Sequence, residues 1–147
     1  MLTQASVPGR AIVAIVIRVL AVFDAAALLF AGIVHLVGVQ IPLGAAVFEE
    51  PPIIPAGVVE GLAGVVFVVA LYAMLTGKTW AWGITLAAHL FAIAGFLLGL
   101  YATRLGTTPF NYDYHRVMLA VFVVGLILLL LPAGRAALAY GGPRRRE

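Results

Sequence analysis

Four long apolar runs, each about the length needed to cross a bilayer, constrain this chain more than any other feature. A hydrocarbon core about 30 Å thick takes about 20 residues of helix. The chain is 64% hydrophobic and only 10% charged, which leaves too little polar surface for a soluble domain of its 147 residues. The sequence therefore predicts a single all-α domain, an integral membrane four-helix transmembrane bundle. Its predicted helices cover residues 11–37, 53–75, 79–101 and 114–131.

The connections between these runs differ in kind. Residues 76–78 (Thr-Gly-Lys) predict a tight turn, so the second and third helices form an antiparallel hairpin. Longer loops are expected over residues 38–52 and 102–113. In the second of these loops, Asn111 and Asp113 are placed to cap the fourth helix.

The two ends of the chain also carry structural signals. The fourth helix is expected to stop at Pro132 and Gly134. The first apolar run is too long for a signal peptide and is interrupted by Arg18 and Asp24, so it is interpreted as a retained first helix.

The distribution of lysine and arginine predicts the orientation in the membrane. Cytoplasmic loops carry an excess of these residues, so the richer side is expected to face the cytoplasm. This places both termini in the cytoplasm and both long loops outside. Alanine, glycine, valine and arginine usage is typical of a GC-rich bacterial genome, which indicates an inner (plasma) membrane. The basic residues of the richer side are Arg10, Arg18, Lys78, Arg135, Arg144, Arg145 and Arg146, against Arg104 and Arg116 on the other.

Ionisable residues inside the predicted helices are few, and each is costly to bury in lipid, by about 2.5–3.5 kcal/mol at a helix centre on insertion scales. Asp24 and His89 fall near mid-membrane and predict a middle polar layer. His35, Glu60 and His115 fall toward the outer side and predict a second layer, with Glu49, Glu50 or Asp113 folding over it. The alternative is that these groups only satisfy one another or are hydrated at the interface.

Three kinds of ligand fit the outer layer. His35, Glu60, His115 and Asp113 form a nitrogen and oxygen set suited to a metal ion. Two histidines at similar depth, His35 and His115, fit the axial positions of a haem. A quinone is the third, because polar groups at the membrane boundary can bind its carbonyls while apolar helices hold its tail.

Other classes of function lack support. The chain has no cysteine, which excludes disulfides and thiol chemistry. It contains no nucleophile elbow, metalloprotease, phosphate-loop or dinucleotide motif, so no catalytic residue is assigned. The net charge of +3 is interpreted as membrane topology rather than nucleic-acid binding.

Small residues mark two helix faces. Glycines at 57, 61 and 64 line the second helix, and small residues recur from 81 to 99 on the third. Such stripes let helix backbones approach closely in lipid. They predict tight packing within the bundle, with a homodimer face as the alternative.

Four short segments of the chain have a combined pattern that can be compared with known families. They are Ile17-Arg18-Val19-Leu20, Ala31-Gly32-Ile33-Val34-His35, Val59-Glu60-Gly61-Leu62-Ala63-Gly64 and Leu131-Pro132-Ala133-Gly134-Arg135. With these segments, the chain from about residue 17 to 135 resembles the DoxX-like four-helix membrane proteins; residues 110–116 are not part of the resemblance. The similarity implies a small membrane subunit associated with quinone-linked sulfur oxidation or oxidative-stress complexes. It carries over no catalytic motif, and only His35 and Glu60 match recurrent polar positions.

Three functional hypotheses follow. The first is an accessory or structural subunit of a quinone-linked membrane redox system, in contact with the lipid bilayer and with a redox partner or a second copy. The second is a haem- or metal-binding redox protein that uses His35, His89 and His115. The third is a proton or small-solute pathway through Asp24 and His89.

Overall fold

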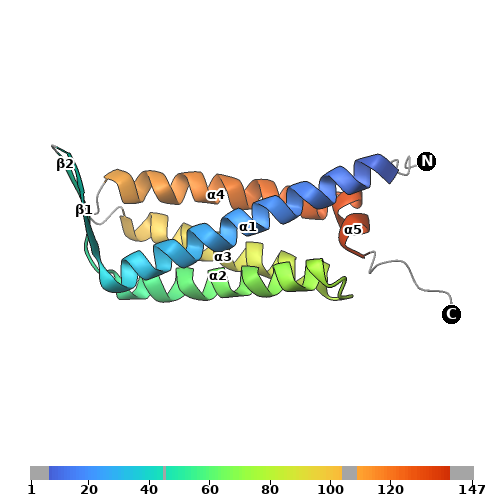
Figure 1. Ribbon diagram of the computed structural model, residues 1–147, viewed down its shortest axis with the longest axis horizontal. Helices are drawn as coiled ribbons and strands as arrows, with labels where there is room; N and C mark the ends of the chain where they lie inside the picture. The colour runs from blue at the N-terminus through green and yellow to red at the C-terminus, as the bar shows by residue number, and fades with distance from the viewer. Residues whose placement is uncertain (1–6, 45, 104–108, 140–147) are drawn as a thin grey trace.

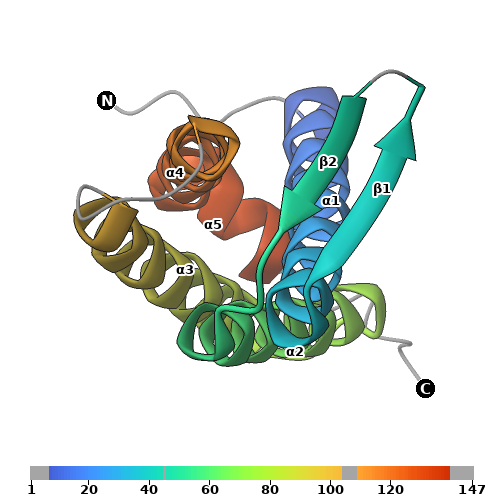
Figure 2. The ribbon, with the colours of Figure 1, turned by 90° about the vertical axis from the view of Figure 1, so that its left-hand side faces the viewer.

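The computed structural model describes residues 7–44, 46–103 and 109–139. Four long helices lie side by side, with a short fifth helix at one end and a two-stranded hairpin at the other (Figure 1). Seen from the hairpin end, the long helices surround a common core (Figure 2). The elements in chain order are α1 (Val7–Val37), β1 (Val39–Leu43), β2 (Ala46–Glu50), α2 (Ile54–Leu75), α3 (Ala81–Thr103), α4 (Pro109–Leu130) and α5 (Pro132–Ala139).

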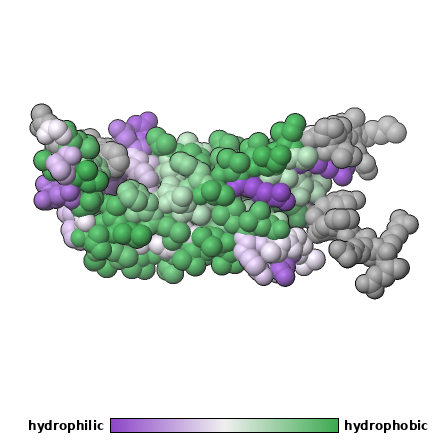
Figure 3. Space-filling view, viewed as in Figure 1, coloured by the Kyte–Doolittle hydropathy of each residue, from purple (hydrophilic) through white to green (hydrophobic). Residues whose placement is uncertain are grey.

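The four predicted apolar helices are confirmed, and each is long and apolar enough to span a membrane. Large apolar side chains such as Phe30, Leu62 and Leu98 are exposed along the outside of the bundle. Figure 3 shows this apolar surface over the long middle of the molecule, with polar residues gathered toward the ends. A bundle with an apolar exterior has lipid as its natural solvent, so the chain is a multi-pass membrane protein.

The loop expected over residues 38–52 is instead an antiparallel hairpin. Strand β1 pairs with β2 in a register that sets Val39 opposite Glu50 and Leu43 opposite Ala46. Gly44 lies at the tip with φ +68°, a conformation that glycine adopts without strain. The prediction of a loop was wrong because a short hairpin with one proline lacks the long alternating pattern that marks most strands.

The fourth helix begins earlier than predicted. It starts at Pro109, a residue type favoured in the first helical turn because the missing N–H has no partner there. Asn111 and Asp113 are therefore inside α4 and do not cap it, which corrects the prediction.

The predicted stop at Pro132 is confirmed, but the chain resumes a helix at once. Pro132 lacks the N–H that would continue α4, and α5 folds back across the end of the bundle. Gly134 allows this turn, because a side chain there would collide with the carbonyl oxygen of Leu128. Helix α5 then buries Leu138 in the core.

Glycines set the contact between α1 and α2. A Cβ on Gly32 would lie 2.8 Å from the backbone nitrogen of Gly61, and one on Gly57 would lie 2.9 Å from the carbonyl oxygen of Gly32. The two backbones are therefore in direct contact, as expected for small-residue faces in membranes. The prediction of tight packing within the bundle is confirmed for this glycine stripe.

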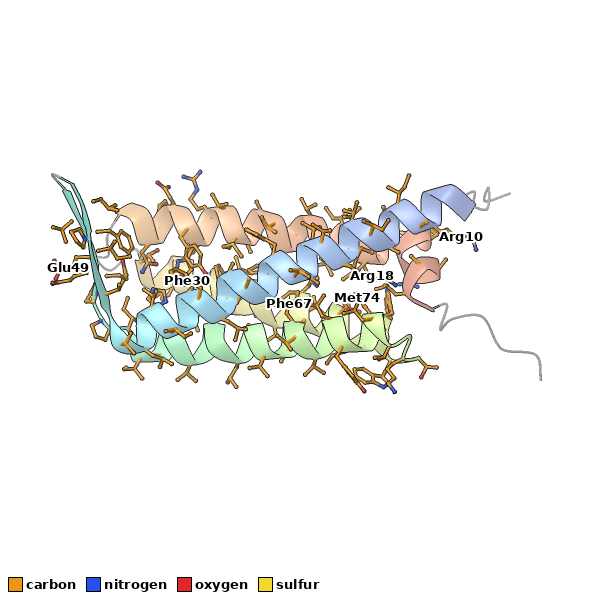
Figure 4. The ribbon with its side chains drawn as sticks, viewed as in Figure 1. Arg10, Arg18, Phe30, Glu49, Phe67 and Met74 are labelled. Carbon is orange, nitrogen blue, oxygen red and sulfur yellow. The ribbon has the colours of Figure 1, made fainter. Side chains whose placement is uncertain are left out.

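Aromatic rings fill the centre of the bundle. The ring of Phe122 lies 6.0 Å from that of Phe67 and 5.0 Å from that of Phe96, so α2, α3 and α4 meet at one cluster. Figure 4 shows Phe67 pointing between the helices at mid-length.

Candidate functional site

The predicted outer polar layer forms at the hairpin end of the bundle. His35 lies in the last turn of α1 and Glu60 in the second turn of α2, and the glycine contact between these helices brings the two side chains together. The Nδ1 atom of His35 lies 2.5 Å from Oε2 of Glu60, and the residues are 4% and 3% exposed. The imidazole thus donates Nδ1–H to a buried carboxylate, a charge-assisted hydrogen bond.

The hairpin and α4 complete this cluster. Strand β2 ends at Glu50, whose carboxylate accepts a hydrogen bond of 2.8 Å from Nδ2 of Asn111. The same carboxylate lies 3.7 Å from Nε2 of His35, and the Asn111 amide lies 3.4 Å from that nitrogen. Three segments far apart in the sequence therefore meet in one buried network, the His35–Glu60–Glu50–Asn111 cluster.

His115 lies beside this cluster on α4. Its Nδ1–H donates to the carbonyl of Asn111 over 2.8 Å, which leaves Nε2 as an acceptor. The ring packs 4.9 Å from Phe96 and against Gly99, where any side chain would collide with the imidazole. Gly99 therefore provides the space that His115 occupies.

Two cavities border the cluster from different sides. The first, of about 350 Å³, lies between α1, the hairpin and α4, and the second, of about 320 Å³, lies between α2 and α3. Their walls are almost entirely apolar apart from the cluster residues. The first is lined by Ala27, Phe30, Ala31, Val34, His35, Ile41, Phe48, Glu50, Asn111 and Tyr114; the second by Ile53, Pro55, Ala56, Val59, Glu60, Gly95, Phe96, Leu98, Gly99, Ala102 and His115.

Each cavity is lined by a residue with a buried polar atom that has no hydrogen-bond partner among the described residues. In the first, the buried hydroxyl of Tyr114 has none. In the second, the buried Oε1 of Glu60 has none, since His35 contacts only the other oxygen. Buried polar groups are normally satisfied, so each of these atoms leaves a hydrogen-bonding position that a water molecule or a ligand can fill.

The predicted middle layer also forms, at the centre of the bundle. Nε2 of His89 lies 3.8 Å from Oδ2 of Asp24, and both residues are at most 1% exposed. Nδ1–H of His89 donates to the carbonyl of Thr85 over 2.8 Å, and Gly125 leaves room for the ring. In the described part of the chain, neither oxygen of Asp24 has a hydrogen bond.

The two layers are separate. Asp24 and His35 are eleven residues apart, which is about 16 Å along a helix. Between them α1 contributes the apolar side chains of Leu28 and Ala31 to the core. A continuous polar path from one layer to the other is absent from the described residues of α1.

The proposed metal-ligand set does not gather in one place. Asp113 is exposed and lies 3.9 Å from Arg116 rather than beside His35. Glu49 is likewise exposed and accepts a hydrogen bond from Gln40. Within residues 7–44, 46–103 and 109–139, no group of three or more histidine, aspartate and glutamate side chains is arranged to hold a metal ion.

For haem, the relevant observation is that His35 has both ring nitrogens against protein groups, Glu60 on one side and Asn111 on the other. An axial bond to iron from His35 would displace one of these contacts.

Sequence reasoning missed the roles of Asn111 and Tyr114. Both lie on the same face of α4 as His115, at the i, i+3 and i+4 spacing of a single helical turn. This spacing was the available signal, and it was obscured by the prediction that Asn111 precedes the helix.

Comparison of the chain with known protein families, with curated proteins and with solved structures finds no match.

Proposed function

We propose that this protein binds a quinone-type ligand within the membrane and acts as an accessory subunit of a quinone-linked redox system. The observation that carries the proposal is the first cavity, an apolar space of about 350 Å³ that ends on the buried His35–Glu60–Glu50–Asn111 cluster. Cavities of this kind, apolar with a few convergent polar groups, are typical of small-molecule sites.

The chemistry of the cavity suits a quinone head group. Quinone carbonyls accept hydrogen bonds, and the hydroxyl of Tyr114 is a donor on the cavity wall with no partner among the described residues. Phe30 is 66% exposed and also lines the cavity, so the space reaches the lipid-facing surface of α1. An isoprenoid tail leaving along Phe30 would stay in the hydrocarbon.

An accessory role is supported by what the chain lacks and by its resemblance to DoxX-like proteins. No catalytic motif is found in the sequence, and lipid-facing apolar side chains cover the bundle exterior. A membrane redox partner, or a second copy of the chain, would dock on this exterior.

The proposed location is a bacterial inner membrane, with both termini in the cytoplasm. The start of α1, the turn between α2 and α3 and helix α5 lie at one end of the bundle and carry Arg10, Arg18, Lys78 and Arg135 (Figure 4). The positive-inside rule assigns this end to the cytoplasm and the hairpin to the outside.

Quinone binding is tested with the purified protein in phospholipid nanodiscs and an azido-substituted short-chain ubiquinone analogue. Irradiation followed by peptide mass spectrometry is expected to place the label on residues 27–50 and 111–114. The substitution Ala27→Leu fills the cavity and should abolish this labelling, whereas Ala26→Leu on the lipid-exposed side of the same turn should not.

A direct affinity measurement completes the test. Loss of the donor in Tyr114→Phe should weaken binding of decylubiquinone by about 3–10-fold, the usual net value of one hydrogen bond. Tyr72→Phe, at an exposed tyrosine near the other end of the bundle, serves as the control. Label spread evenly over the lipid-facing helices, with equal affinity in all variants, would rule out the site.

A further inference from the structure

The second cavity differs from the first in its hydrogen-bonding character. Its wall contains two polar side chains, Glu60 and His115, and the remaining lining residues are apolar. Glu60 is 3% exposed, and its Oε1 has no hydrogen-bond partner among the described residues. His115 directs its Nδ1–H away, to the carbonyl of Asn111, so the nitrogen it offers is an acceptor.

The wall therefore presents acceptors and no side-chain donor. A carboxylate held in apolar surroundings gains most from a partner that brings both a donor and a positive charge. His35 contacts the Oε2 atom of Glu60, and neither arginine nor lysine of the described segments forms an ion pair with this residue. The second oxygen of Glu60 therefore has no cationic partner among the described residues, which leaves that position for a ligand.

We infer that the cavity between α2 and α3 binds a protonated amine carried on a compact apolar body. The ammonium group donates to Oε1 of Glu60 and to Nε2 of His115, since three N–H donors allow both contacts at once. The apolar body lies against Val59, Phe96 and Leu98. Gly95 and Gly99 form the α3 side of this space, where Val59 packs against Gly95 and the ring of His115 packs against Gly99.

The inference concerns a second site and goes beyond quinone binding. The two cavities have different lining residues. The first offers a hydrogen-bond donor, Tyr114, and the second offers hydrogen-bond acceptors. Failure of one proposal leaves the other standing, and Ala27→Leu distinguishes them because it fills only the first cavity and should leave amine binding unchanged.

The test compares two ligands of nearly equal shape, adamantan-1-amine and adamantan-1-ol, by isothermal titration calorimetry at pH 7. The protein is placed in nanodiscs of neutral phosphatidylcholine, and empty nanodiscs give the partitioning background. The amine is expected to bind at least about tenfold more tightly than the alcohol, because a charge-assisted hydrogen bond is stronger than a neutral one. Equal binding of both ligands, or amine uptake no greater than in empty nanodiscs, would overturn the inference.

Two pairs of variants locate the site. Glu60→Gln keeps the side-chain shape and should abolish the preference for the amine, while Asp24→Asn removes a buried carboxylate elsewhere and should preserve it. Ala56→Leu fills the cavity and should prevent binding, whereas Ala94→Leu on the exposed face of α3 should not. An amine preference that survives both Glu60→Gln and Ala56→Leu would place the ligand elsewhere.

Discussion

At the scale of single residues, two of the buried histidine–carboxylate contacts among the described residues differ in geometry. His35 and Glu60 are hydrogen-bonded at 2.5 Å, whereas His89 and Asp24 are 3.8 Å apart with no hydrogen bond. Both pairs lie inside helices that can span the membrane. Because the environments are similar and the contacts are not, the two pairs offer an internal comparison of what a hydrogen bond contributes in a bundle core.

The coupling energy between two paired side chains is expected to be larger where they form a hydrogen bond. Double-mutant cycles with His35→Leu and Glu60→Leu should give an interaction of about 1–3 kcal/mol in the free energy of unfolding. The single Leu variants should each be less stable than the double variant, because one partner is then left buried and unpaired.

The matched cycle uses His89→Leu and Asp24→Leu, and its coupling energy should be smaller. Unfolding in mixed micelles by added sodium dodecyl sulfate gives both values. A larger coupling in the His89–Asp24 cycle would show that distance and hydrogen bonding do not control these pairs.

At the scale of elements, the contact between α1 and α2 depends on particular glycines rather than on the glycine stripe as a whole. A Cβ on Gly57 would lie 2.9 Å from two backbone atoms of α1, while a Cβ on Gly61 would meet nothing within 4 Å. Since a backbone cannot yield as a flexible side chain can, only one of these two positions excludes alanine.

Gly57→Ala is therefore expected to destabilise the bundle by about 1–3 kcal/mol, the usual cost of overpacking. Gly61→Ala should be neutral or slightly stabilising, because alanine favours the helix over glycine by about 1 kcal/mol. Thermal unfolding in detergent, followed by circular dichroism, compares the two. Equal losses of stability in the two variants would mean that the α1–α2 contact requires both glycines equally.

The hairpin is attached to the bundle through a second glycine contact. Gly38 and Gly44 have nearly the same φ, +70° and +68°, but a Cβ on Gly38 would lie 2.9 Å from the ring of Pro52 and one on Gly44 would meet nothing. The backbone strain of a substitution is thus similar at the two sites, and the steric contact differs.

Gly38→Asn should loosen the hairpin more than Gly44→Asn, since asparagine tolerates positive φ in both but collides only at residue 38. Hydrogen–deuterium exchange of the β1 and β2 amides measures this directly. Faster exchange is expected in Gly38→Asn alone, and similar exchange in the two variants would contradict the steric explanation.

At the scale of the whole molecule, charge is separated along the bundle axis. Arg10 and Arg18 lie toward the α5 end (Figure 4), together with Lys78 in the α2–α3 turn and Arg135 on α5. Glu49, Glu50 and Asp113 lie toward the hairpin end, where Arg116 is beside Asp113. The apolar middle between them has the length of the hydrocarbon core, about 30 Å or 20 residues of helix. This separation gives the two faces of the membrane different chemistry.

The absence of cysteine from the sequence allows a clean test of orientation. In intact spheroplasts a membrane-impermeant maleimide should label Glu49→Cys on the hairpin, whereas Lys78→Cys in the α2–α3 turn should react only after permeabilisation. The reverse pattern would invert the proposed orientation, and labelling of both sites in intact spheroplasts would argue against a spanning bundle.

The sequence by itself determined the number, type and approximate limits of the long helices. Apolar runs of about 20 residues have few alternatives in lipid, because every backbone group must be satisfied within its own segment. It also determined the candidate polar residues, since each ionisable side chain inside such a run stands out against an apolar background. Depth along these helices predicted one layer with Asp24 and His89 and another with His35, Glu60 and His115, whereas the pairing of His35 with Glu60 is seen only in the structure.

Only the tertiary structure decided which hydrogen-bond partners and cavities surround those residues. The hairpin brings Glu50 to His35, and the early start of α4 brings Asn111 and Tyr114 inward. Asn111 then meets Glu50, 61 residues away in the sequence, and His35, 76 residues away. The two cavities likewise arise where α1 meets α4 and α2 meets α3, and they depend on glycines whose function is visible only beside their neighbours. Depth in a membrane is a local property that sequence encodes directly, whereas the direction in which a side chain faces a neighbouring helix is set by packing.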